Sequence, residues 1–197
     1  MLVCTVNNTK KFMSLLLKEN TFDKFELRSA KITTFTTFEI DGKLNKEYFD
    51  EEPNDDYCRW ESVKQFAFDI IKGNRLPKFI KIVFAASPAL RDKIAPDASV
   101  LFLNVIFENN SITLMTGSST KTFTMDKSAE YAWDEYIKRF LNKYEILVST
   151  QLDWVLNFSW LLFLRCYNVI CKINKPLFLV NMAISEVMKN GKRQFIY

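Results

Sequence analysis

The chain has 197 residues, which suits one domain with an appendage, and its hydrophobic content of 48% is enough to build a packed core. Histidine is absent, which excludes histidine bases, Ser-His and Cys-His nucleophile pairs and histidine-ligated metals. The formal net charge is +4, but residues 1–147 contain 21 basic and 21 acidic residues. The excess charge therefore lies in residues 148–197, and it is not evidence for a DNA-binding domain.

The cysteine and glycine residues argue against further kinds of site. The four cysteines (Cys4, Cys58, Cys166 and Cys171) form no C-x-x-C pair, so the sequence indicates neither a zinc site nor a disulfide framework. The sequence contains neither G-x-x-x-x-G-K nor G-x-G-x-x-G, the two glycine-rich patterns that bind nucleotide phosphates. The N-terminus lacks the apolar core of a signal peptide. We expect a reducing, cytoplasmic location, no cofactor and no catalytic residue.

The first 42 residues predict strands around one helix. Residues 2–6 suit a strand, and Asn8 or Thr9 can cap the helix that follows. Residues 25–40 are rich in Thr, Phe and Ile, which favours either two strands or one bent strand. Asp41-Gly42 is a turn signal.

An acidic loop follows, with five carboxylates within seven residues. Carboxylates could ligate Mg²⁺ or Ca²⁺, but the spacing matches no EF-hand loop, so a solvated loop is favoured. The metal-ligand candidates are Asp50, Glu51, Glu52, Asp55 and Asp56.

A helix is predicted over residues 60–71, with Gly73 just beyond its end. A buried strand is predicted over residues 79–84, and Ser87-Pro88 opens a short helix. Between the first helix and the strand lies the only basic cluster of the first 147 residues, which supplies the candidates for phosphate contact: Lys72, Arg75, Lys78 and Lys81.

The secondary-structure pattern is clearest from residue 99 to residue 143. Residues 100–107 predict a buried strand, and Asn109-Asn110 predicts a tight hairpin turn because Asn tolerates positive φ. The pattern then predicts a second strand, a turn at 117–119 and a third, half-exposed strand over 120–125.

Asp126 is the expected N-cap of an amphipathic helix. Its apolar stripe continues to residue 144, and Asp134 with Lys138 and Glu135 with Arg139 are expected as pairs on the outer face. A ligand-binding role for Trp133 and Tyr136 is an alternative, but a core role is favoured.

After Glu145 the composition changes. Residues 152–171 are almost continuously apolar, and a second helix is predicted over 177–188. Twenty such residues could span a bilayer, but the cost of Arg165 favours a helical hairpin that associates with a partner, with a membrane surface or with the domain. The docking candidates are Trp154, Trp160, Leu161 and Phe163.

The phrases TFDKFELRSAKITTFTTFEIDGKLN, FIKIVFAASP and TGSSTKTFTMDKS, with the W-x₅-F-x₃-IIKG stretch from Trp60, resemble a family of uncharacterised bacterial domains from Gram-positive anaerobes. The resemblance covers residues 3–146. It implies a shared fold and no chemistry, so no functional residue is carried over.

We therefore expect an α+β fold over residues 1–147, with a mostly antiparallel sheet packed by amphipathic helices, and a helical apolar tail over 148–197. The favoured function is a non-catalytic binding or assembly domain. Two alternatives stay open. One is a clamp-like domain that contacts nucleic acid through the basic cluster, by topological analogy only. The other is a metal-dependent enzyme that uses the acidic loop.

Overall fold

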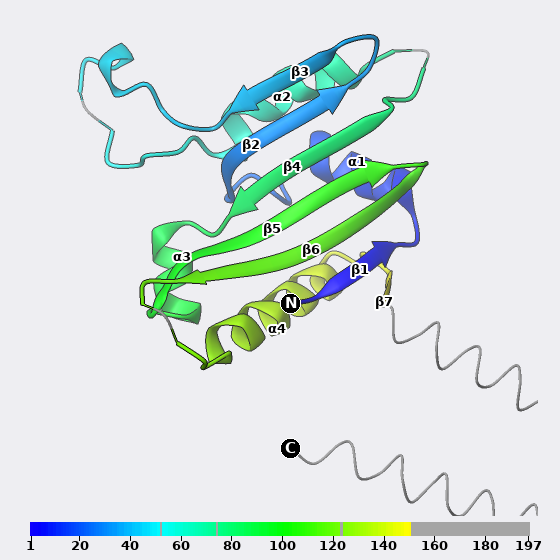
Figure 1. Ribbon diagram of the computed structural model, residues 1–197. Helices are drawn as coiled ribbons and strands as arrows, with labels where there is room; N and C mark the ends of the chain where they lie inside the picture. The colour runs from blue at the N-terminus through cyan, green and yellow to red at the C-terminus, as the bar shows by residue number, and fades with distance from the viewer. Residues whose placement is uncertain (52, 74, 123, 151–197) are drawn as a thin grey trace, which may run out of the picture. The chain divides into compact units, whose positions relative to one another are not determined.

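The computed structural model describes residues 1–51, 53–73, 75–122 and 124–150. Within them, seven strands form one sheet in the order β3-β2-β4-β5-β6-β1-β7, and every neighbouring pair is antiparallel. The strands are β1 (Val3–Val6), β2 (Glu26–Thr33), β3 (Thr37–Asp41), β4 (Phe79–Ala85), β5 (Ala98–Glu108), β6 (Ser111–Thr120) and β7 (Val148–Thr150). The α-helices are α1 (Thr9–Leu17), α2 (Trp60–Ile71), α3 (Pro88–Ile94) and α4 (Ser128–Lys143). The expected α+β class is confirmed (Figure 1).

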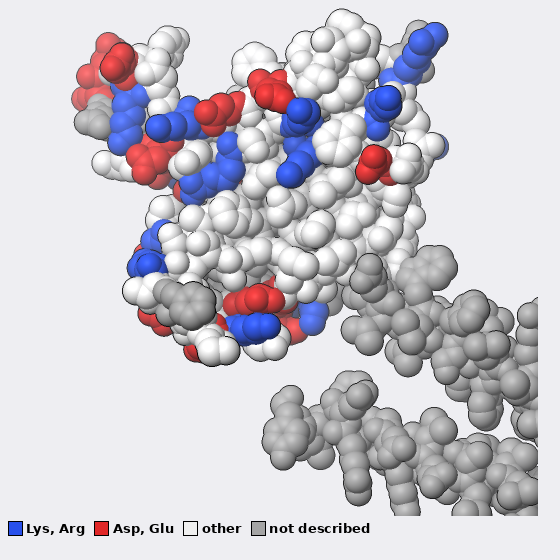
Figure 2. Space-filling model, in the orientation of Figure 1, with Lys and Arg blue, Asp and Glu red and all other residues white. Residues whose placement is uncertain are grey.

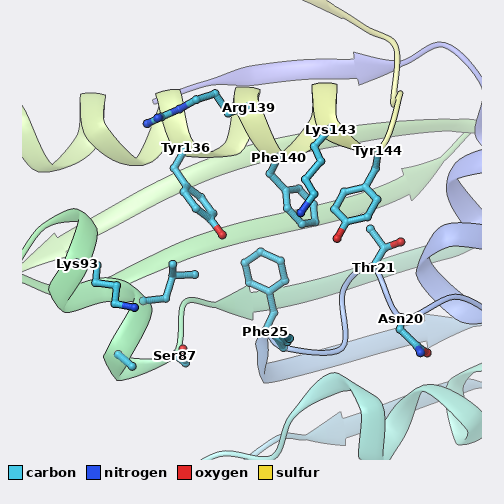
Figure 3. Close-up of a pocket in the computed structure, with 13 residues that line it drawn as sticks. Asn20, Thr21, Phe25, Ser87, Lys93, Tyr136, Arg139, Phe140, Lys143 and Tyr144 are labelled. Atoms are coloured by element: carbon cyan, nitrogen blue, oxygen red, sulfur yellow. The ribbon is translucent and has the colours of Figure 1, made fainter.

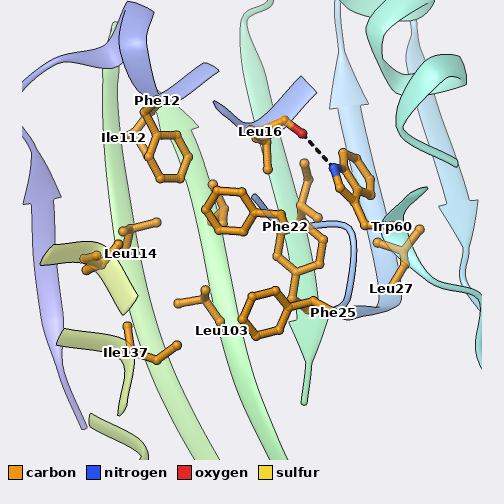
Figure 4. Close-up of a cluster of buried hydrophobic side chains, with 14 of the residues drawn as sticks. Phe12, Leu16, Phe22, Phe25, Leu27, Trp60, Leu103, Ile112, Leu114 and Ile137 are labelled. Atoms are coloured by element: carbon orange, nitrogen blue, oxygen red, sulfur yellow. Dashed lines mark hydrogen bonds between the residues drawn. The ribbon is translucent and has the colours of Figure 1, made fainter. Parts of the chain in front are cut away.

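Helices α1, α2 and α4 cover one face of the sheet (Figure 1). Alternate side chains of the central strands point to that face, as period-two patterning requires, and they are almost completely buried: Ile80, Ile82, Phe84, Leu101, Leu103 and Val105. Phe22, which follows α1, is fully buried at the centre of this core. Its ring centroid lies 5.4–6.1 Å from those of four other phenylalanines (Figure 4): Phe12, Phe25, Phe84 and Phe140.

Two buried tryptophans fix helices through both packing and hydrogen bonding. The indole N–H of Trp60, the first residue of α2, donates to the backbone oxygen of Leu16 in α1 at 2.7 Å (Figure 4). The indole N–H of Trp133 in α4 donates to the backbone oxygen of Phe102 in β5, also at 2.7 Å. Each ring thus fills the core while its polar atom is satisfied.

The other face of the sheet is not covered by these helices, and it faces the viewer in Figure 1. Its side chains lie in rows that cross the strands, such as Lys31, Lys81, Ile106, Thr113 and Thr5. Few charges lie over β5 and β6 on this face (Figure 2).

Several local predictions are confirmed. Asn8 caps α1, since its side chain accepts from the N–H of Lys11 at 3.0 Å. Residues 25–40 form two strands rather than one bent strand. Asn109 and Asn110 adopt φ of 50° and 60°, the left-handed values that a two-residue hairpin turn needs.

The predicted turn at 117–119 and the third strand over 120–125 are wrong. Strand β6 continues to Thr120, because the eleven-residue β5 offers it backbone partners as far as Ala98. Gly117 lies within the strand opposite Phe102.

Two predictions for α4 are also wrong. The N-cap is Lys127 rather than Asp126, whose carboxylate accepts instead from the backbone N–H and the hydroxyl of Ser128, each at 2.8 Å. Neither expected pair on the outer face forms. The Glu135 carboxylate pairs with Lys138 at 2.7 Å rather than with Arg139, so Lys138 does not pair with Asp134. Asp134 lies elsewhere. It is buried against β6, where its carboxylate accepts from the Thr116 hydroxyl and from the N–H of Leu2.

Gly42 does not form the predicted turn. A Cβ there would lie 1.8 Å from the backbone oxygen of Leu27, so only glycine fits. The Gly42 N–H donates to the oxygen of Arg28, and the N–H of Cys58 donates to the oxygen of Gly42. The glycine thus allows a close crossing of three chain segments.

Residues Met1–Gln151 form one compact unit. It includes β7, which pairs with β1 beyond the predicted division after residue 147. That division stays a prediction.

Candidate functional site

A groove with a cavity volume of about 750 Å³ opens between three parts of the chain. Residues 20–25, which lead into β2, form one side. The start of α3 with Lys93 forms another, and the last two turns of α4 form the third (Figure 3). This volume lies within the range of small-molecule sites in proteins.

Aromatic rings form the floor of the groove. Phe25 points up from the β2 side toward Phe140 on α4, and their ring centroids lie 5.4 Å apart in an edge-to-face arrangement (Figure 3). The ring centroid of Tyr144, the residue that follows α4, lies 5.1 Å from that of Phe140. Tyr136 supplies a fourth ring.

The periodicity of α4 places these rings. Trp133, Ile137 and Leu141 lie at the centre of its apolar stripe and are fully buried in the core. Tyr136, Phe140 and Tyr144 lie along the edge of the same stripe, where they remain half-buried. The core role and the ligand-binding role that were considered for Trp133 and Tyr136 therefore apply to different residues. Trp133 belongs to the core, and Tyr136 lines the groove.

Four cations surround this floor: Lys24, Lys93, Arg139 and Lys143. In the described part of the chain, none of them forms an ion pair with a carboxylate. Lys93 and Lys143 reach toward the cavity, whereas Arg139 is directed away from it (Figure 3). The Lys143 ammonium lies 5.5 Å from the centroid of the Tyr144 ring.

The groove also presents hydroxyl groups. Burial raises the pKa of Tyr136, and the neighbouring Tyr144 raises it further. The Tyr136 hydroxyl therefore keeps its proton at neutral pH and can donate a hydrogen bond. Thr21, Ser87 and Asn20 add further polar groups, and the lining contains no carboxylate. Such a set of cations, donors and rings suits an anion on a flat apolar body.

A second cavity of about 140 Å³ is lined by an ion pair between Arg28 and Glu26. The Arg28 guanidinium donates to the carboxylate of Glu26 at 2.9 Å and lies 3.5 Å from the centroid of the Tyr57 ring. Burial raises the pKa of Glu26, and Arg28 opposes that shift. We interpret this cluster as structural, because it connects β2 to the acidic loop.

Two of the acidic-loop residues pair with cations from outside the loop. Asp56 lies 3.1 Å from Lys46, and Asp55 lies 3.7 Å from Arg59. Asp50 and Glu51 are exposed, and Glu52 lies outside the described residues. In the described ranges, no group of three Cys, Asp or Glu side chains is arranged to hold a metal ion.

The predicted basic cluster divides between two surfaces. Lys72, Arg75 and Lys78 are exposed on the connection between α2 and β4. Lys81 lies on the uncovered face of the sheet, opposite Lys31. None of these four residues lines the groove.

The two described thiols are unsuited to nucleophilic chemistry. Burial raises the pKa of the Cys4 thiol to about 11 and also raises the pKa of Cys58. Both cysteines are free, and both thiols are protonated at neutral pH.

The predicted docking residues Trp154, Trp160, Leu161 and Phe163 lie outside the described residues. Within the part of the chain that the structure describes, no helix is long and apolar enough to cross a bilayer.

Sequence patterns did not identify the groove. Tyr136, Phe140 and Tyr144 were visible only as members of an apolar stripe. Lys24, Lys93 and Lys143 are far apart in the chain, so only the packing of α3 and α4 against the lead into β2 brings them together.

Comparison with known proteins indicates a family but no activity or ligand. A model of a family of unknown function matches residues 15–149. No curated protein and no solved structure matches the chain.

Proposed function

Since the chain belongs to the DUF5721 family of unknown function, we propose from the groove alone that the domain is a non-catalytic binding module for an anionic ligand with a flat apolar body. The observation that carries this proposal is an aromatic floor surrounded by four cations that have no carboxylate partner in the described part of the chain.

The rings, the lysines and the tyrosine hydroxyl of the groove would each bind a different part of the ligand. The rings of Phe25, Phe140 and Tyr144 offer apolar surface to a flat ligand, and aromatic pairs contribute about 0.5–1.5 kcal/mol beyond the area they bury. Lys93 and Lys143, which reach toward the cavity, would pair with the ligand's negative charge. The Tyr136 hydroxyl would donate a hydrogen bond to the same anion.

A small ligand is favoured over a polyanion. The groove is concave and its charge is local, whereas residues 1–147 are neutral as a whole. Non-specific nucleic-acid binding depends on phosphate neutralisation over an extended basic surface. The bacterial and cytoplasmic setting expected from the sequence is part of this proposal, and the free thiols of Cys4 and Cys58 agree with a reducing compartment.

The test is a fluorescence titration of the full chain with 8-anilinonaphthalene-1-sulfonate, which joins a sulfonate to flat rings. The test variant carries Lys93→Gln and Lys143→Gln. The matched control carries Lys10→Gln and Lys127→Gln, two exposed lysines that do not line the groove. We expect the groove variant to bind the probe about tenfold more weakly than the control, through the loss of two charge-assisted contacts. ATP should displace the probe, and uncharged adenosine should displace it less. Equal probe affinity in the two variants would reject the groove as the site.

A further inference from the structure

Two large apolar side chains protrude from neighbouring loops. Phe35, in the connection between β2 and β3, is 92% exposed, and Leu76, in the connection between α2 and β4, is 73% exposed. A single exposed apolar side chain is ordinary, but two that lie side by side among cations form a surface patch.

Backbone pairing holds the two loops together. The N–H of Lys78 donates to the oxygen of Thr33 at 2.8 Å, and Thr33 lies opposite Phe79 in the sheet register. Phe35 follows Thr33 by two residues, and Leu76 precedes Lys78 by two residues. Both apolar side chains are therefore carried at the same end of β2 and β4 (Figure 1).

Each loop is anchored close to its exposed side chain. The N–H of Thr34 donates to the oxygen of Thr36 at 2.8 Å, and this turn leaves Phe35 at the tip. The Phe35 ring contacts that of Phe38 edge to face, with centroids 5.9 Å apart. Leu76 directly precedes Pro77, which is buried. Hydrogen bonding and packing next to each side chain thus leave Phe35 and Leu76 exposed.

Three cations lie close to Leu76 in the chain. Lys72, Arg75 and Lys78 are exposed on the same connection as Leu76, and among the described residues none of them pairs with a carboxylate. Glu108, on β5 opposite Phe79, is the carboxylate that the sheet register places beside this end. Basic side chains gather at this end of the molecule (Figure 2).

We propose that Phe35, Leu76, Lys72, Arg75 and Lys78 form a surface that docks on an anionic lipid membrane, which we call the membrane-facing tips. Lipid headgroups would pair with the three cations, while the boundary of the acyl chains would accept the two apolar side chains. A nucleic acid would satisfy the cations and could stack on Phe35, but it offers Leu76 no partner. A protein interface would need roughly 800 Å² of continuous surface on each side, which two separate loop tips do not supply.

The test is co-sedimentation of the full chain with phosphatidylcholine vesicles, with and without phosphatidylglycerol in place of about a third of the lipid. One variant carries Lys72→Gln, Arg75→Gln and Lys78→Gln, and its control carries Lys10→Gln, Lys43→Gln and Lys127→Gln. A second variant carries Phe35→Ser and Leu76→Ser. Its control carries Tyr48→Ser and Met125→Ser, which are 83% and 89% exposed in the native chain.

The charge variant should lose at least tenfold in partitioning to the anionic vesicles, since each interfacial cation contributes about fivefold. The apolar variant should partition more weakly to both kinds of vesicle, and both controls should behave as the unmodified chain does. Binding that resides in residues 152–197 would be equal in all variants, and that result would overturn the proposal. The proposal also fails if the charge variant loses retention of a single-stranded oligonucleotide while its vesicle binding is unchanged.

Discussion

Phe22 shows how much of this fold depends on a single residue. Its ring has contacts with four other aromatic rings, from α1, the lead into β2, β4 and α4. The Phe22→Ala substitution should therefore lower the free energy of unfolding by about 3–5 kcal/mol, through lost burial and the cavity left behind. Urea denaturation followed by far-UV circular dichroism measures this change.

Phe35→Ala is the matched control, because the same ring is removed from a side chain that is 92% exposed. We expect it to change the free energy of unfolding by less than about 0.5 kcal/mol. Comparable losses in the two variants would mean that the cluster around Phe22 is not the centre of the core.

Residue-level chemistry could be predicted only in part. The absence of histidine excludes every site that needs a histidine side chain, and the core role of Trp133 follows from its place in the apolar stripe. The groove role of Tyr136 could not be predicted. An apolar stripe shows which side of a helix faces the core. It does not show which part of the stripe a neighbouring element leaves exposed. Here that neighbour is α3, more than 40 residues away in the chain.

At the scale of elements, the hairpin between β5 and β6 can be tested through its turn. Asn110 has φ of 60°, which β-branched residues adopt only with strain. Asn110→Val should lower the free energy of unfolding by about 1–2 kcal/mol, whereas Asn110→Gly should retain the native value or raise it. Urea denaturation of the two variants side by side measures the difference. A valine variant as stable as the glycine variant would show that this turn is not left-handed in solution.

Element positions were predicted better than element ends. The helices over residues 60–71 and 129–144 were expected from their apolar periodicity and occur almost as predicted. Gly117-Ser118-Ser119 looked like a turn, because small polar residues favour turns in isolation. The long partner strand β5 decides otherwise, and the local sequence of β6 does not contain that information. Strand order was likewise beyond the sequence, since β1 lies between β6 and β7.

At the scale of the whole molecule, we expect the fragment 1–151 to fold without the remaining residues. Its contacts group together, and it contains every strand of the described sheet. The fragment should melt cooperatively in differential scanning calorimetry and be soluble without detergent. The shorter fragment 1–147 lacks β7, which leaves β1 unpaired on one side. It should still fold, with a melting temperature several degrees lower.

The full chain is the reference for both fragments. A fragment 1–151 that fails to fold while the full chain is a soluble monomer would place residues 152–197 within the core. In that case the proposed division of the chain would be wrong.

The groove and the membrane-facing tips lie at opposite ends of one strand. Residues 20–25 of the groove lead into β2, and Phe35 lies two residues beyond its last residue, Thr33. An eight-residue strand is about 26 Å long, so a ligand in the groove and a lipid surface at the tips would not compete for space.

The position of β1 has a consequence for biosynthesis. Residues 3–6 leave the ribosome well before both of their partner strands, which lie at residues 113–115 and 148–150. At a translation rate of about 5–20 residues per second, the first strand waits for several seconds before either partner exists. During that interval the apolar residues of β1 have no neighbouring strand with which to pair. Strand β1 of the nascent chain is therefore open to chaperones and to aggregation during that interval, and the described sheet is completed only when translation passes residue 150.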